Sequence, residues 1–175
     1  MTTSGRPLPS EYASYAQPDI DRVEGDDIVT TLTQQREMVT DLFSIGEEKA
    51  RGLTYAPGKW TLKEVLGHLC DDERIFAYRA LCIARGDTRP LPGFDEMEYM
   101  AGASFESRTM ADILAEYRTV RWATLTLFAS MTDEAWLRRG IVNEYEVSVR
   151  GLAFHIAGHE LHHLRVVRER YLAAR

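Results

Sequence analysis

The residues best suited to chemistry lie near the C-terminus, in the stretch Val149–Leu172. This stretch holds four of the chain's five histidines, at His155, His159, His162 and His163. Apolar residues recur in it at helical spacing, which predicts one amphipathic helix: Leu152, Ile156, Val166 and Val167. At ~100° per residue, His159 and His163 fall inside the buried stripe and His155 and His162 toward its edges. Two imidazoles one turn apart and aimed into a core need a partner, and a metal ion satisfies both at once.

The fifth histidine, His68, lies in a second predicted helix, near the edge of its apolar face. Together with His159 and His163 it would form a three-imidazole site between facing helices, which is how helical bundles build metal sites. Three protein ligands and an open position are typical of a catalytic zinc or a similar divalent ion. Because imidazole suits several metals, Zn, Ni and Fe all remain candidates.

Several other roles stay open for these residues. A buried histidine is commonly a hydrogen-bonded core residue, although four within nine positions favour a shared site. His155 and His162 are expected beside the ligands or at the surface. Asp72 falls ~40° further toward the core than His68, so it could orient that ring or carry a proton. Otherwise it belongs to a solvated acidic helix face.

A protease motif competes for the same histidines. His159-Glu160-Leu161-His162-His163 matches HExxH, in which Glu160 would be the general base. Only twelve residues follow the motif, and they continue the same helix, so a third ligand cannot come from a later segment. No strand is expected that could hold a peptide. Nor does a second ExxH accompany Glu160-x-x-His163, as a di-iron bundle requires.

The elements that must position these side chains are four long helices. Their predicted ranges are Asp26–Lys49, Leu62–Arg85, Met110–Ser130 and Val149–Leu172. Thr61 and Glu64 form a capping box ahead of the second helix. A short helical turn is expected over Thr132–Leu137, then a connector, Ile141–Val149, with at most a little extended structure around Val142–Val147. The pattern predicts an all-α four-helix bundle over 26–175, preceded by an extended lead-in over 1–25.

A long loop, Asp87–Arg108, should join the second and third helices, because prolines and glycines interrupt it. Loops of this length in compact domains are commonly functional. Its larger side chains could wall a pocket or simply pack the loop down: Phe94, Tyr99, Met100 and Phe105.

Bulk properties exclude several classes of function. The net charge of −6 argues against nucleic acid and against anionic membranes as partners. No apolar run reaches the ~18 residues of a membrane span, and the N-terminus lacks a secretion signal. Cys70 and Cys82 would lie ~18 Å apart on one helix, so they cannot pair. Free thiols suit the cytoplasm, where we expect this protein.

The residues Pro57–Leu69 (PGKWTLKEVLGHL), then Asp71 and Glu73, and then the segment His155–His163 resemble the DinB-like, or YfiT-like, metalloenzyme family. The resemblance runs from Asp26 onward. It implies a four-helix bundle with up-down-down-up connections, often a homodimer. It also implies that His68, His159 and His163 are the metal ligands, in agreement with their positions on the helical wheel.

What this resemblance implies for activity is a metal-dependent enzyme with a small-molecule substrate. Relatives in the family include thiol-S-transferases and a mycothiol-dependent isomerase, in which the metal lowers the pKa of a small thiol, and others are called hydrolases. We therefore expect a divalent ion that activates a low-molecular-weight thiol or water, in a transferase-like or hydrolase-like reaction. No motif identifies which thiol. The alternative is a non-catalytic metal-binding bundle that acts as a stress-linked dimer.

Overall fold

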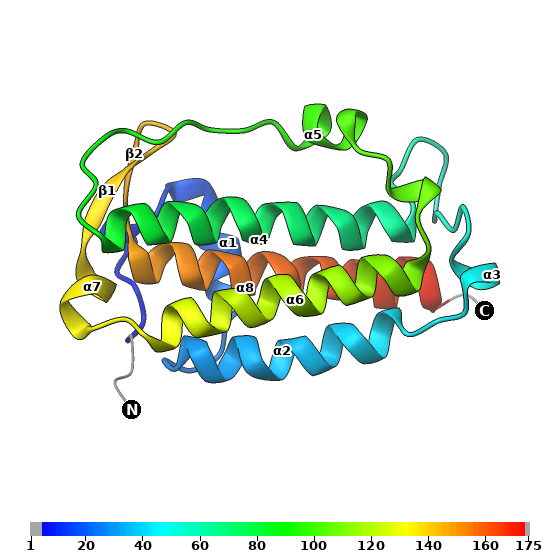
Figure 1. Ribbon diagram of the computed structural model, residues 1–175, viewed down its shortest axis with the longest axis horizontal. Coiled ribbons are helices and arrows are strands. Elements are labelled where there is room, and N and C mark those ends of the chain that lie inside the picture. Colours follow the sequence, from blue (N-terminus) through cyan, green and yellow to red (C-terminus); the bar gives the residue numbers. More distant parts are fainter. Residues whose placement is uncertain (1–4, 174–175) are drawn as a thin grey trace.

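The computed structural model describes residues 5–173, which form a bundle of four long helices (Figure 1). These are α2 (Ile28–Phe43), α4 (Leu62–Ala84), α6 (Met110–Ala129) and α8 (Val149–Val166). A π-helical turn, Val167–Leu172, continues α8. The expected four-helix bundle is confirmed. No helix in the described part of the chain combines the length and the apolar character that crossing a membrane requires.

The order of the helices gives the bundle an uncommon topology. Helices α2 and α8 run in one direction and α4 and α6 in the other, so the connections are up-down-down-up as expected (Figure 1). Helix α4 packs against α6 and α8, and so does α2. Because α4 and α6 are parallel neighbours, the chain between them must return along the whole bundle, roughly 30 Å. Residues 85–109, hereafter the crossover, do this.

Side-chain caps set where the helices begin. The capping box predicted at Thr61 is confirmed: its backbone N–H donates to Glu64 Oε2 at 2.7 Å, and the Glu64 N–H donates to Thr61 Oγ1 at 3.3 Å. Ser148 Oγ accepts the Gly151 N–H at 3.0 Å and starts the histidine-bearing helix α8. These caps satisfy N–H groups that have no partner inside the helix.

The first predicted helix is shorter than expected. Helix α2 ends at Phe43, and a separate turn, α3 (Glu47–Ala50), follows. The hydroxyl of Ser44 donates to the Thr40 carbonyl at 2.6 Å, and the chain then passes through Gly46 in an extended conformation. Ser and Gly both favour ends of helices over their interiors, which accounts for the break.

The little extended structure expected around Val142–Val147 is in fact part of a two-stranded sheet, which the all-α prediction did not include. After α7 (Asp133–Leu137), strands β1 (Arg139–Val142) and β2 (Tyr145–Ser148) form an antiparallel hairpin. Its two turn residues, Asn143 and Glu144, have positive φ angles of 47° and 69°. Two-residue hairpin turns need this conformation but usually carry Asn-Gly, so the sequence signal was weak.

The N-terminal segment contains three short helical elements, and is not the extended lead-in that was expected. It contains two 3₁₀ turns, Pro9–Glu11 and Ser14–Ala16, and helix α1 (Gln17–Arg22). Helix α1 packs on α8, where a Cβ at Gly158 would collide with the backbone carbonyl of Asp19. The missing side chain lets the two backbones approach closely. Residues 1–4 lie outside the described residues.

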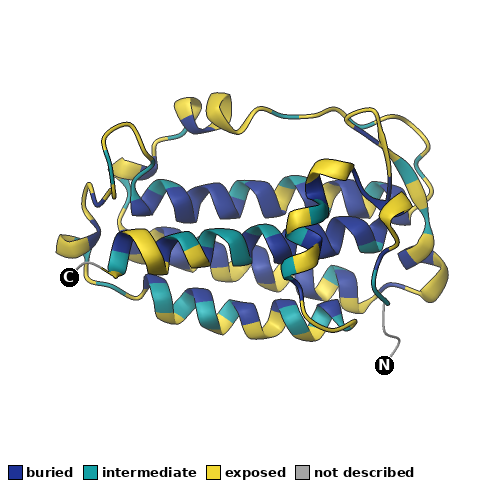
Figure 2. Cartoon of the chain, turned by 180° about the vertical axis from the view of Figure 1, so that it is seen from behind, coloured by how far each residue is buried: buried dark blue, intermediate teal, exposed yellow. Residues whose placement is uncertain are grey.

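The crossover contains helix α5 (Glu96–Gly102) and a 3₁₀ turn, Phe105–Ser107. Figure 2 shows its mostly exposed outer surface above the buried inner faces of the bundle helices. Both expectations for its large side chains hold in part. Met100 and Phe105 pack into the core, with Phe105 against Gly67 of α4. Phe94 and Tyr99 line cavities.

Candidate metal centre

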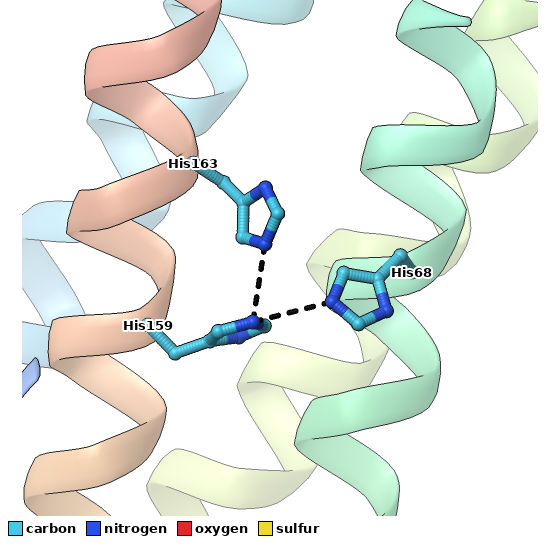
Figure 3. Close-up of side chains that lie close together, drawn as sticks. All are labelled: His68, His159 and His163. Carbon is cyan, nitrogen blue, oxygen red and sulfur yellow. Dashed lines mark hydrogen bonds between the residues drawn. The ribbon is translucent and has the colours of Figure 1, made fainter. Parts of the chain in front are cut away.

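The side chains of His68 from α4 and of His159 and His163 from α8 converge on one point inside the bundle (Figure 3). His159 Nε2 lies 3.2 Å from His68 Nε2 and 3.1 Å from His163 Nε2. Three nitrogens bound tetrahedrally to an ion at ~2.0–2.1 Å would stand about 3.3 Å apart. The spacing and the donor type therefore fit a divalent ion, and the group could hold one.

Asp72 holds the central ring of this group. Its Oδ2 lies 3.2 Å from His159 Nδ1, and the residue is buried on α4. A proton shared on this side of the ring leaves Nε2 free to bind a metal, which is how carboxylates commonly orient metal-binding histidines. Of the roles left open for Asp72, orienting His68 and lying on a solvated face are both wrong, because the buried carboxylate contacts His159. Because α4 and α8 are antiparallel, the residue one turn beyond His68 faces His159.

Burial and neighbouring charges give the three imidazoles different pKa values. Burial, reinforced by His159, lowers the pKa of His68 to about 4 and that of His163 to about 2. Burial would also lower the pKa of His159, but the Asp72 carboxylate outweighs it and raises this pKa to about 8. At neutral pH without an ion, the His159 ring is therefore doubly protonated and positively charged, and the other two rings are neutral. A metal ion must displace one of these protons.

The two remaining histidines of α8 lie outside the converging group. His155 is buried, stacks on Phe76 with ring centroids 4.4 Å apart, and has its Nδ1 3.5 Å from Asp19 Oδ2. His162 is only partly buried and meets His163 edge-on. Their positions match the expectation of groups beside the ligands or near the surface.

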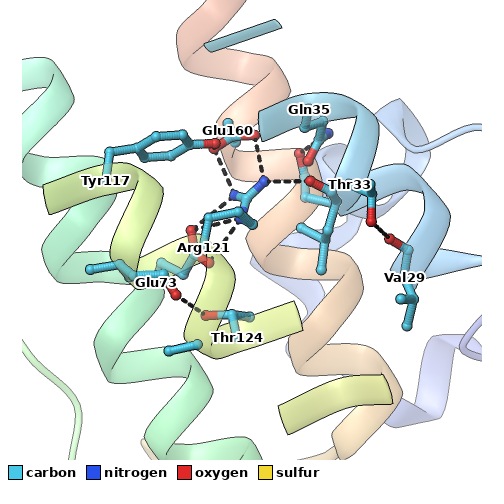
Figure 4. Close-up of polar contacts among 12 residues, drawn as sticks. Val29, Thr33, Gln35, Glu73, Tyr117, Arg121, Thr124 and Glu160 are labelled. Atoms are coloured by element: carbon cyan, nitrogen blue, oxygen red, sulfur yellow. Dashed lines mark hydrogen bonds and ion pairs between the residues drawn. The ribbon is translucent and has the colours of Figure 1, made fainter. Parts of the chain in front are cut away.

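Glu160 points toward Tyr117 and Arg121, in a separate buried cluster (Figure 4). It accepts hydrogen bonds from the Tyr117 hydroxyl at 2.8 Å and from Arg121 at 2.7 Å. Arg121 is fully buried and also pairs with Glu73 at 2.9 Å. Because Arg121 and Tyr117 occupy its carboxylate, Glu160 is not available as a general base beside His159. The HExxH match is therefore not a protease site.

Cavities reach the converging rings from two sides. One of about 270 Å³ touches His163 and has Trp60 and Met97 in its wall. Another of about 260 Å³ touches His159 and extends under the crossover. The Trp60 ring also lies against His68, with centroids 4.8 Å apart. A ligand could therefore approach the centre from solvent.

One acidic residue at the centre was missed from the sequence. Glu96, the first residue of α5, is largely exposed and has its Oε2 3.7 Å from His68 Nε2. It lies in the segment that was expected to be an irregular loop. The only local signal is Asp95, which caps α5 by accepting the Met97 and Glu98 N–H groups. That signal predicts a helix start but not what the helix faces.

Comparisons with known proteins agree with this fold. A family model described as the DinB superfamily matches residues 31–167. Among solved structures, the chain is similar to YfiT from Bacillus subtilis, described as "a probable metal-dependent hydrolase with an unusual four-helix bundle topology". The TM-score is 0.65 at 17% identity, over 93% of this chain and 89% of that chain, which shows a shared fold. A search of curated proteins gives no match.

Proposed function

We propose, from the premise that the chain belongs to the DinB superfamily, that it is a metal-dependent enzyme whose ion is held by His68, His159 and His163. A divalent ion there would supply Lewis acidity and lower the pKa of a coordinated water or small thiol. The substrate would be a small electrophile, attacked in a hydrolase-like or thiol-S-transferase-like reaction. YfiT, described as a probable hydrolase, supports the first of these.

The observation that carries the proposal is the convergence of three Nε2 atoms on one point, with Asp72 on the far nitrogen of the central ring. Without an ion, one proton on His159 must serve two neutral acceptors, and each buried nitrogen left unsatisfied costs about 1–3 kcal/mol. An arrangement that serves only packing has no reason to gather three such atoms.

The surroundings favour an enzyme over a structural ion site. A structural site is closed, with protein ligands at every position, whereas cavities here reach both His159 and His163. Glu96 stands at the open side, where its carboxylate can accept a proton from an incoming nucleophile. Trp60 and Phe94 provide apolar walls that limit access of water.

The finer points of the proposal are the identity of the ion and the assembly. Three imidazoles suit Zn, Ni or Fe, and a low-molecular-weight thiol is the candidate second cofactor. A small-molecule substrate and a homodimer also belong to the proposal. Light scattering of the purified protein measures the oligomeric state directly.

The metal site is tested with protein purified without a histidine tag, because a nickel column could load an empty site. Elemental analysis and titration with Co²⁺ should show one tightly bound ion per chain. His163→Ala should lose it, whereas the matched variant His162→Ala, one residue away on the same helix, should keep it. Equal binding by both variants, or no binding by the wild type, would overturn the site.

Turnover is tested on the loaded protein and on an EDTA-treated sample. A nitrophenyl ester reports hydrolysis, and chlorodinitrobenzene with a panel of small thiols reports thiol transfer. The proposal expects one of the two activities to depend on the metal. A higher melting temperature with the ion, with no turnover of either kind, would favour the non-catalytic bundle instead.

A further inference from the structure

Arg79 is a buried cation that forms no ion pair with any described residue. It lies on α4, eleven residues after His68 and on nearly the same face of the helix, and is only 5% exposed. Its Nη2 donates to the Pro92 carbonyl at 2.7 Å. Its guanidinium carbon lies over the rings of Phe76, at 4.8 Å, and Phe94, at 5.5 Å. Among the residues described, no carboxylate comes within ion-pair distance of it.

This situation is costly and sets Arg79 apart from the other deeply buried arginine. Burying a guanidinium without a counter-ion is strongly unfavourable. Arg121 avoids that cost by pairing with two carboxylates, Glu73 and Glu160. Arg79 has five N–H donors, and the structure uses one of them for a protein hydrogen bond.

The free donors of Arg79 adjoin the cavity that reaches the metal centre. The cavity of about 260 Å³ is lined by both Arg79 and His159. Asp72, which orients His159, lies seven residues before Arg79 on α4, or roughly 10 Å along the helix axis. A small molecule that touches the ion could therefore extend along α4 to the guanidinium.

None of the acidic groups in this cavity forms an ion pair with Arg79. Asp72 pairs with His159, and Asp19 lies within ion-pair distance of His155 and also pairs with Arg22. The Glu96 carboxylate lies beside His68. Arg79 therefore keeps donors that neither these carboxylates nor the Pro92 carbonyl uses.

We infer that Arg79 is the recognition group for a carboxylate on the substrate or thiol, at the far end of the cavity from the reacting atom. A guanidinium packed against aromatic rings keeps its in-plane donors for a planar, two-oxygen acceptor, the geometry that suits a carboxylate. This inference rests on the proposed function and narrows its substrate class to small anionic molecules.

The test uses Co²⁺-loaded full-length protein and two probes of equal length, mercaptohexanoate and mercaptohexanol. Thiolate binding to cobalt produces a charge-transfer absorbance from which each Kd is obtained. Wild type should bind the carboxylate probe at least about 10-fold more tightly than the alcohol, equivalent to about 1.4 kcal/mol. Arg79→Met should bring the ratio to about one with unchanged cobalt content. Equal affinities in the wild type, or an unchanged ratio in Arg79→Met, would overturn the inference.

Two further variants separate recognition from a merely structural role at Pro92. Arg79→Lys keeps the charge but loses the paired N–H donors of the guanidinium, so its ratio of affinities for the two probes should be intermediate. Arg74→Met removes an exposed arginine of α4 that does not line this cavity, and it should keep the wild-type ratio. If Arg79→Met only loosens the crossover, its melting temperature falls but its ratio stays at the wild-type value, which contradicts recognition.

A metal-free measurement keeps this inference distinct from the proposed function. Hexanoate should raise the melting temperature of the wild-type protein more than hexanol does, and Arg79→Met should abolish the difference. Failure to bind cobalt alongside a retained hexanoate effect would remove the metal site and leave the anion site standing. Cobalt binding without any preference for the carboxylate probes would do the reverse.

Discussion

Two buried polar clusters both draw residues from α4 and α8. The arginine cluster comprises Glu73, Tyr117, Arg121 and Glu160, and the histidine cluster comprises His68, Asp72, His159 and His163. Asp72 and Glu73 are neighbours on α4, as are His159 and Glu160 on α8. Each pair of neighbours divides its side chains between the two clusters, which lie on different sides of the helices (Figures 3 and 4).

The clusters differ in whether the protein alone satisfies them. Arg121 donates to both carboxylates and to the Leu32 carbonyl, and the Tyr117 hydroxyl donates a further hydrogen bond to Glu160. In the histidine cluster, three ring nitrogens face one another, and only the His159 ring is cationic at neutral pH. Burial of polar groups is therefore common to both, and the unmet coordination is what marks the second as the functional candidate.

The largest effect expected from breaking this contrast is the loss of metal from His159→Ala. The change removes the ring that both other nitrogens face and leaves Asp72 buried without its partner. Disturbing a group that only orients a ligand costs roughly 10–100-fold in metal affinity, and removing the ligand should cost more. Titration with Zn²⁺ against a competing chelator measures this.

Glu160→Gln is the matched control for that experiment, because it alters the next residue but belongs to the arginine cluster. Its folded form should bind Zn²⁺ as tightly as the wild type does. A comparable loss of affinity in both variants would mean that the two clusters are not independent.

The arginine cluster should instead control stability. Arg121→Met leaves two buried carboxylates without a cation, and breaking a buried pair in this way typically costs about 3–5 kcal/mol. Urea unfolding of the metal-free protein measures the free energy of unfolding. The metal content of the folded fraction should stay at the wild-type value. A change below about 1 kcal/mol in the free energy of unfolding would show that the cluster contributes little to stability.

Asp72→Asn should produce a smaller change within the histidine cluster. The amide can still contact His159 Nδ1, but it does not raise the basicity of the ring. We expect a roughly 10–100-fold weaker Kd for Zn²⁺, with the helical content unchanged by circular dichroism. Wild-type affinity in this variant would show that the Asp72–His159 contact has no influence on the ion.

Metal binding by the histidine cluster should also depend on pH. Since the pKa of His159 is raised to about 8 and that of His68 lowered to about 4, binding an ion between these limits should release one proton. The Kd should therefore weaken about tenfold for each pH unit on going from about pH 7 to about pH 5. In Asp72→Asn the slope should be shallower, because His159 loses the charge that raises its pKa.

The raised pKa of His159 also predicts how the stability of the metal-free protein changes with pH. Without an ion, protonated His159 stabilises the folded state, fully below its ordinary pKa of 6.5 and not at all above about 8. Urea unfolding of the metal-free wild type should show this loss as the pH rises. The metal-loaded protein should not show it, because its His159 is already deprotonated.

Much of the helical bundle was predictable from local sequence patterns. Apolar spacing and the Thr61 cap predicted the starts of α4, α6 and α8, because these signals depend on residues within a few turns of one another. The hairpin and the helical turns before α2 were missed. Their stability depends on distant surfaces, such as Gly158 of α8 for helix α1.

The sequence by itself determined that His159 and His163 share one face of a buried helix, since helical geometry places residues four apart on the same side. Only the tertiary structure decided which groups meet those rings. The antiparallel register of α4 and α8 brings Asp72 to His159, and the crossover brings Glu96 to His68 and Phe94 over Arg79. These contacts join residues from separate elements, and no local spacing encodes the relative placement of elements that pack through their side chains.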